Sequence, residues 1–248
     1  MNIHIVISLC FVPLVACCLI CRCVLKQNLL ILLRAVLLGL LAIVPIMFIQ
    51  FYLHQLISML FFPAHQHLEY LSRALIVNGL IEETIKMAVL FLLPAKRMPL
   101  KLFFCCALIC GLSLACFESV IYFLNSLQVT EMNGVHPFYR QILLRMFTAN
   151  IIHLCCTGLC GLCVWALRHH TQAASAFLFA VIAHGYYNFF LLYTVSLRYF
   201  AIAAILFAAV ECRVQYMKLR QNETLHKQFL NTNGHTTVAG DSLRAPKT

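Results

Sequence analysis

The chain of 248 residues is short of charge, and most of all of acidic side chains. It has 8 acidic residues, and charged residues make up 10% of it. Soluble globular domains carry about 25% charged residues, so this class of protein is excluded. Glycine and proline are also scarce, with 9 and 7 residues, and the apolar runs are too long for the strands of a transmembrane barrel. A polytopic helical membrane protein remains, in agreement with a hydrophobic content of 62%.

The basic residues outnumber the acidic ones and give a formal net charge of +10. They are scattered at the ends of apolar runs, where they suit the cytoplasmic connections of a membrane protein better than a binding surface. We therefore expect no nucleic-acid partner. The lipid bilayer is the expected surroundings of the chain.

Cysteine is abundant, with 14 residues, and nearly all of them stand inside apolar runs. Buried cysteine packs as a small hydrophobic residue. Cys160 and Cys163 form a C-x-x-C pair, but no second pair stands near it at the spacing of a zinc site. Packing is therefore the expected role, with metal or redox chemistry as the alternative.

Long apolar runs predict seven membrane-spanning helices and an all-α fold. To within a few residues the runs are 3–24, 29–53, 73–94, 101–126, 142–167, 173–193 and 197–212. The first run also resembles a secretory signal, but no basic residue precedes it and apolar residues continue past Cys17. We expect a retained first helix with its N-terminus outside, which leaves most lysines and arginines on the cytoplasmic side. Residues 1–212 then form one membrane domain, and the polar residues 213–248 form a disordered cytoplasmic tail.

Polar residues interrupt four of the predicted spans. Ionisable groups at membrane depth are costly, so they indicate a function by default. The polar residues in these spans are Glu82 and Glu83 with Lys86 one turn later, Glu118, His153, and His184 with Asn188. A helix rises about 1.5 Å per residue, so the depth of each polar residue can be counted from the polar residue at the outer end of its span. The depths are roughly 12 to 15 Å, and His184 lies one turn deeper. The sequence therefore predicts one layer, near mid-membrane and toward the outer face.

Each group also has a purely structural explanation. Glu82 or Glu83 could pair with Lys86 on the same helix, Glu118 could accept a hydrogen bond in the core, and a single buried histidine is often a packed residue. These explanations do not account for the shared layer.

The chemistry that such a layer supports is hydrolysis of an amide. A carboxylate beside a histidine can deprotonate a water, and a second histidine with an amide can stabilise the developing oxyanion. The same set could instead bind a divalent metal such as zinc, with Glu83, Glu118, His153 and His184 as candidate ligands. The residues leave this choice open.

Four short motifs follow one another on four predicted spans. The first is E-E-x-x-K at 82–86, and the second runs from Gly111 to Tyr122 and contains Glu118. The third is H-x4-G at 153–158, and the fourth is H-x-x-x-N at 184–188. Together they resemble the PrsW family of intramembrane proteases, which is related to the CAAX-prenyl endopeptidases and bacteriocin-processing enzymes. The resemblance covers residues 75–192. Ser113 and Leu114 stand where the family usually has Gly and Phe, which affects packing rather than chemistry.

The resemblance implies proteolysis of a membrane-anchored, anti-sigma-factor-like substrate on the outer side of a bacterial plasma membrane. Glu82 or Glu83 would activate water, and Glu118 and His153 would orient it or hold a metal. His184 and Asn188 would stabilise the oxyanion. The alternatives are a non-catalytic scaffold of the same fold and a proton- or cation-coupled transporter.

Overall fold

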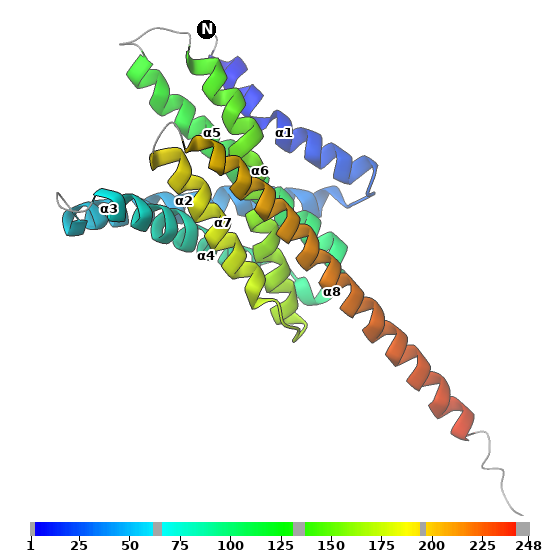
Figure 1. The fold of residues 1–248 in the computed structure, drawn as a ribbon. Helices are drawn as coiled ribbons and strands as arrows, with labels where there is room; N and C mark the ends of the chain where they lie inside the picture. The colour runs from blue at the N-terminus through cyan, green and yellow to red at the C-terminus, as the bar shows by residue number, and fades with distance from the viewer. Residues whose placement is uncertain (1–2, 62–65, 131–136, 194–196, 242–248) are drawn as a thin grey trace, which may run out of the picture.

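The computed structural model describes residues 3–61, 66–130, 137–193 and 197–241, and within these ranges it contains helices and short turns but no strand (Figure 1). The predicted all-α fold is confirmed. The elements are α1 (Ile3–Cys23), α2 (Leu29–Phe61), α3 (Gln66–Ser72), the π-helix η1 (Arg73–Ile81), α4 (Glu82–Leu90), the 3-10 turn η2 (Ala95–Arg97), α5 (Leu100–Thr130), α6 (Pro137–Arg168), α7 (Ala174–Tyr193) and α8 (Arg198–Asp241).

Six of the helices are long and apolar enough to cross a membrane: Ile3–Cys23, Leu29–Leu60, Leu100–Asn125, Leu144–Arg168, Ala174–Leu191 and Arg198–Leu225. The seventh expected span, 73–94, is divided between η1 and α4. The backbone keeps right-handed helical angles at Ser72 and again at Ile81, so α3, η1 and α4 form one continuous helical segment with a π-helical stretch in its middle.

The end of the chain differs from the expectation of a disordered tail from residue 213. Residues 213–241 continue α8 as one helix, which runs past the ends of the other helices in Figure 1. The apolar face of this helix remains in contact with the bundle as far as Leu219, which is buried. The expected boundary at residue 212 thus falls inside α8, and the separation of the chain into a membrane domain and a cytoplasmic tail stays a prediction.

The π-helix η1 ends directly before Glu82 and packs closely on α7. A Cβ added at Gly79 would lie 2.7 Å from the Val181 carbonyl oxygen and 3.4 Å from the Gly185 Cα. Glycine is therefore needed for the two backbones to approach. A π-helical turn is wider than an α-helical one and often marks a functional site. Here it determines the direction in which the two glutamates of α4 project.

Helices α5 and α6 form the buried centre of the bundle. Much of both helices is inaccessible, including Phe103, Ile109 and Leu159, each 0% exposed. Gly111 faces α6 so closely that an added Cβ would lie 2.6 Å from the His153 carbonyl oxygen. Close helix contact through small residues is the usual way in which membrane helices associate.

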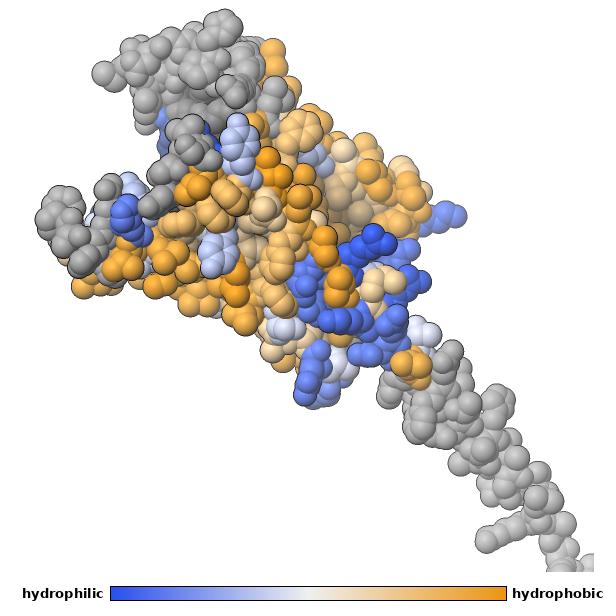
Figure 2. All heavy atoms as spheres, viewed as in Figure 1, coloured by the Kyte–Doolittle hydropathy of each residue, from blue (hydrophilic) through white to orange (hydrophobic). Residues whose placement is uncertain are grey.

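The outer surface is largely apolar. Figure 2 shows hydrophobic residues over most of the described bundle and a group of hydrophilic residues where α8 leaves it. Large side chains such as Val44, Met59 and Phe147 are exposed. Without lipid an apolar surface of this extent would be unfavourable, so it indicates contact with the bilayer.

The cysteines agree with a packing role. All 14 are free thiols, and most are buried in the helical core. One of them, Cys160, also contacts a carboxylate of the candidate site.

Replacing Gly111 by alanine should lower the free energy of unfolding by about 1–3 kcal/mol, because the added Cβ meets backbone that cannot move aside. Gly158→Ala is the matched control, since its Cβ would meet the ends of the Leu108 and Cys212 side chains, at 2.8 and 3.0 Å. Unfolding of both variants in detergent micelles gives the comparison. An equal or larger loss at Gly158 would contradict this account of the α5–α6 contact.

Candidate active site

Five of the six residues predicted for the site meet in the interior of the bundle. Glu82 and Glu83 come from the first turn of α4, Glu118 from α5, His153 from α6 and His184 from α7. All but Glu118 are buried. These five of the residues that the depth count placed in one layer are therefore in contact.

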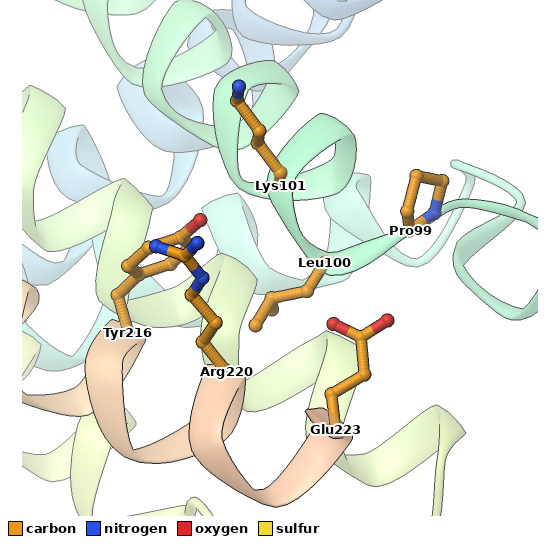
Figure 3. Close-up of a pocket in the computed structure, with 6 residues that line it drawn as sticks. All are labelled: Pro99, Leu100, Lys101, Tyr216, Arg220 and Glu223. Carbon is orange, nitrogen blue, oxygen red and sulfur yellow. The ribbon is translucent and has the colours of Figure 1, made fainter. Parts of the chain in front are cut away.

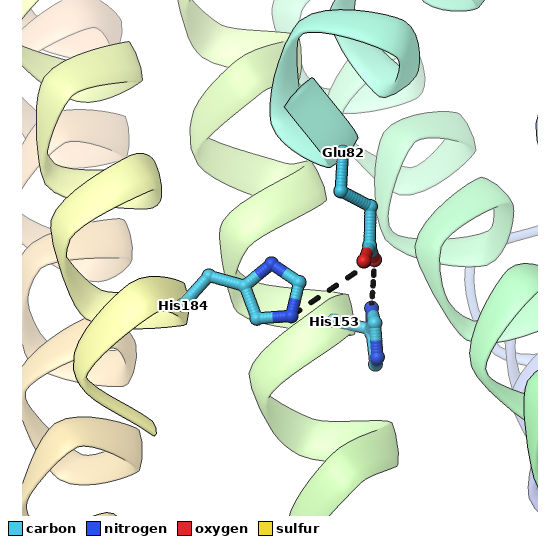
Figure 4. Close-up of side chains that lie close together, drawn as sticks. All are labelled: Glu82, His153 and His184. Atoms are coloured by element: carbon cyan, nitrogen blue, oxygen red, sulfur yellow. Dashed lines mark ion pairs between the residues drawn. The ribbon is translucent and has the colours of Figure 1, made fainter. Parts of the chain in front are cut away.

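Glu82 lies between the two histidine rings (Figure 4). Its Oε1 atom is 3.1 Å from His153 Nδ1 and 3.9 Å from His184 Nε2. The two rings approach edge to face, with 4.8 Å between centroids and 71° between planes. One nitrogen of each histidine thus faces the same carboxylate oxygen.

The other nitrogen of each histidine faces a second carboxylate. His153 Nε2 lies 2.8 Å from Glu118 Oε2, and His184 Nδ1 lies 2.6 Å from Glu83 Oε1. Carboxylates on the outer nitrogens of a histidine pair fix the orientation and tautomer of each ring. Glu83 and Glu118 therefore hold the two histidines from opposite sides.

Lys86 is buried in the middle of these groups. Its Nζ atom lies 2.9 Å from Glu82 Oε1, 2.7 Å from Glu83 Oε1 and 2.9 Å from His153 Nδ1. The ammonium has three N–H donors and no acceptor, so the Nδ1 atom of His153 accepts and its Nε2 carries the hydrogen that faces Glu118. The ion pair that was expected on α4 is present, but it is part of the site rather than an alternative to it.

The tautomer of His184 follows in the same way. Its Nδ1 atom hydrogen-bonds the Glu83 carboxylate and therefore carries a hydrogen. In the neutral form of each ring, the inner nitrogen is thus an electron-pair donor directed toward Glu82.

The two adjacent glutamates have different surroundings. Glu83 is 0% exposed, and its Oε1 atom accepts hydrogen bonds from Lys86 and His184. Its Oε2 atom accepts one from Cys160 Sγ at 3.4 Å. Glu82 Oε2 accepts a bond from Gln50 at 3.3 Å, whereas Glu82 Oε1 makes ion-pair contacts but no hydrogen bond of normal geometry in the described chain. Of the two adjacent glutamates, Glu82 is therefore the one that still has an acceptor atom to offer, as Glu118 also does at its Oε2 atom.

The site is most open at Glu118, whose side chain is 28% exposed. Arg145 of α6 lies beside it, with Nη2 3.5 Å from Glu118 Oε2, and its guanidinium covers the Tyr122 ring at 3.7 Å. A cation over an aromatic face is held by the quadrupole of the ring. Arg145 and Tyr122 thus form the rim on the accessible side of the cluster.

Asn188 is the predicted site residue that the structure does not bring into the cluster. Its Nδ2 atom donates to the His184 carbonyl oxygen of its own helix at 3.2 Å. The role in oxyanion stabilisation stays a prediction. Sequence reasoning missed Gln50 and Cys160, because Gln50 stands near the expected end of a span and Cys160 has the composition of a packing residue.

The inner donor atoms fit a metal ion. One donor atom each from Glu82, His153 and His184 lies within 4.8 Å of the others. Tetrahedral zinc with nitrogen and oxygen ligands separates neighbouring ligand atoms by about 3.3 Å. The 3.1 Å between Glu82 Oε1 and His153 Nδ1 is close to this separation, and the 3.9 Å between Glu82 Oε1 and His184 Nε2 is longer. A buried oxygen without a hydrogen bond, Glu82 Oε1, is an atom that a cation would satisfy. The candidate set differs from the expected one, because Glu83 and Glu118 lie on the outer nitrogens and Glu82 takes the inner position.

Comparison with known proteins decides the family. The family model described as PrsW family intramembrane metalloprotease matches residues 27–210, which include every residue of the cluster. The chain belongs to the PrsW family of intramembrane metalloproteases. Searches of curated proteins and of solved structures gave no match. Family membership, with six helices among the described residues that are long and apolar enough to cross a membrane, makes it an integral membrane protein of a peptidase family that acts on membrane proteins.

Replacing Lys86 by methionine should lower the free energy of unfolding by about 3–5 kcal/mol, because two carboxylates would remain buried without their cation. Adding Glu83→Gln should restore part of the loss by removing one of these charges. Unfolding would be measured in detergent with a chelator present, so that no metal replaces the ammonium. Lys218→Met, at an exposed position of α8, is the control. A loss at Lys86 no larger than that at Lys218 would contradict the buried ion pairs.

Proposed function

We propose that this chain hydrolyses a peptide bond of a membrane-anchored protein within the membrane, and that the attacking water is activated at Glu82. One observation carries the proposal. Glu82 Oε1 faces one nitrogen of His153 and one nitrogen of His184, and the outer nitrogens of both rings are held by further carboxylates. This arrangement orients a water and supplies a proton acceptor at the same place.

In the metal-free form, Glu82 Oε1 accepts the proton of the attacking water and later returns it to the leaving amine. His184 Nε2 orients the water by accepting its other hydrogen, while His153 Nδ1 accepts a hydrogen bond from the Lys86 ammonium. The Lys86 ammonium, 2.9 Å from Glu82 Oε1, keeps the carboxylate ionised and in place. Glu83 positions His184, and Cys160 and Lys86 occupy the remaining Glu83 acceptor sites.

The family name and the donor set also support a metal. Glu82, His153 and His184 would hold the ion, for which we propose zinc, and it would polarise the scissile carbonyl and the attacking water. Lys86 would then lose its contacts with Glu82 and His153. Glu118, the most accessible carboxylate of the cluster, would be left to accept the proton. The two forms thus assign the proton to different glutamates.

The substrate is proposed to be a single-pass membrane protein of the anti-sigma-factor type, cleaved toward the outer side of a bacterial plasma membrane. The expected orientation, with the N-terminus outside, places the Arg145 end of α6 on that side. N-terminal peptide profiling of membranes from cells that express the wild type or Glu82→Gln would identify the substrate. New N-termini in or beside membrane spans should appear with the wild type alone.

Cleavage of that substrate in liposomes should fall by about 10²–10⁴-fold in Glu82→Gln, since the proton acceptor is lost. Glu83→Gln should cost less, about 10–100-fold, because it weakens the support of His184 and Lys86 and leaves the proton acceptor in place. Glu211→Gln on α8, a carboxylate outside the cluster, is the matched control. Wild-type rates in a folded Glu82→Gln variant would refute the assignment.

A chelator separates the two forms. Loss of cleavage with chelator that zinc restores, together with a large loss in Glu118→Gln, would establish the metal form. Cleavage that is unaffected by chelator would establish Glu82 as the base.

A further inference from the structure

A second polar feature lies far from the catalytic cluster. A cavity of about 260 Å³ opens between the start of α5 and the middle of α8 (Figure 3). It is lined by Pro99, Leu100, Lys101, Tyr216, Arg220 and Glu223. Lys101 precedes Glu118 by 17 residues on the same helix, which places the cavity about 25 Å from the cluster. It therefore has no part in the reaction.

Two cations and a helix N-terminus meet in this cavity. Lys101 and Arg220 are exposed, and neither forms an ion pair in the part of the chain that the structure describes. The first N–H groups of α5 have no acceptor within the helix, and the helix dipole adds positive potential there. Figure 3 shows the Glu223 carboxylate turned away from the Arg220 guanidinium. Two cationic side chains and one anionic side chain line the cavity, so the net charge of its wall is positive.

The walls of the cavity are held in place by packing. The Tyr216 ring stacks on Phe104 of α5, with 4.8 Å between centroids and 28° between planes. Leu100 forms an apolar floor and is 1% exposed. The cavity is therefore a fixed contact between α5 and α8 rather than a gap between mobile side chains.

The surroundings place the cavity at the membrane–water interface. In Figure 2 the hydrophilic residues gather beside the apolar surface where α8 leaves the bundle. Basic pockets between membrane helices at this level bind anionic lipids.

We propose that this cavity binds the phosphate group of an anionic membrane phospholipid, through Lys101, Arg220 and the N-terminal N–H groups of α5. An apolar surface for the acyl chains adjoins a positive pocket for the headgroup. Bound there, the lipid joins the start of α5 to α8. The proposal is independent of the catalytic residues.

Native mass spectrometry of the full chain, released from nanodiscs of mixed phosphatidylglycerol and phosphatidylcholine, tests the site. The wild type should retain phosphatidylglycerol in preference to phosphatidylcholine. The double variant Lys101→Gln/Arg220→Gln should bind it about tenfold more weakly or worse, because two charge-assisted contacts are lost. Arg213→Gln/Lys218→Gln is the matched control: it removes the same charge from exposed positions of α8 outside the cavity.

The charge-retaining double variant Lys101→Arg/Arg220→Lys should keep the lipid, which separates loss of charge from a failure to fold. Equal retention by the glutamine double variant and the wild type, or equal loss in the control pair, would overturn the proposal. A second arm adds inorganic phosphate in detergent without lipid. Binding of phosphate at this site, with no preference for phosphatidylglycerol in nanodiscs, would show that the ligand is a free phosphate and not a lipid.

Discussion

The ion-pair cluster around Lys86 is the constraint on which the rest of the bundle depends. One ammonium and two carboxylates of α4 are buried together, where each charge would be very unfavourable alone. Their polar atoms find partners on α2, α6 and α7, through Gln50, His153 and His184. The four segments must therefore assemble around the cluster. A helix that is displaced by one turn leaves a buried charge without its partner.

Glycine makes this assembly geometrically feasible. The side chains of the cluster are short compared with the usual distance between helix axes, so the backbones must approach closely. Gly111 allows α5 to contact α6 at the level of His153, and Gly79 with Gly185 allows η1 to contact α7 at the level of His184. The close contacts thus lie beside the two histidines of the cluster. The packing of the bundle and the geometry of the site have the same cause.

The sequence predicted which residues meet, because depth along a membrane helix follows from residue count. It did not predict which atoms face each other. Glu82 and Glu83 are adjacent and therefore project about 100° apart, and the rotation of α4 decides which one faces the inner nitrogens. That rotation follows the π-helical stretch η1, which no sequence pattern indicated. Asn188 has the predicted spacing from His184, but its amide bonds to its own helix. The length of α8 beyond residue 212 was also missed, since its polar composition resembles that of a disordered tail.

The exposure of the carboxylates rises from Glu83 through Glu82 to Glu118, so the two adjacent glutamates differ in their access to water. Glu83 is sealed by Lys86, His184 and Cys160, so neither water nor a peptide can reach its carboxylate. Glu118 stands at the opposite, accessible end, beside Arg145. Glu82 lies between them, with one oxygen not yet committed to a hydrogen bond. A substrate that enters past Glu118 meets Glu82 and both histidines before it could meet Glu83. The order of burial therefore supports the roles proposed for the two residues, with Glu83 as a support for His184 and Glu82 as the group that acts on water.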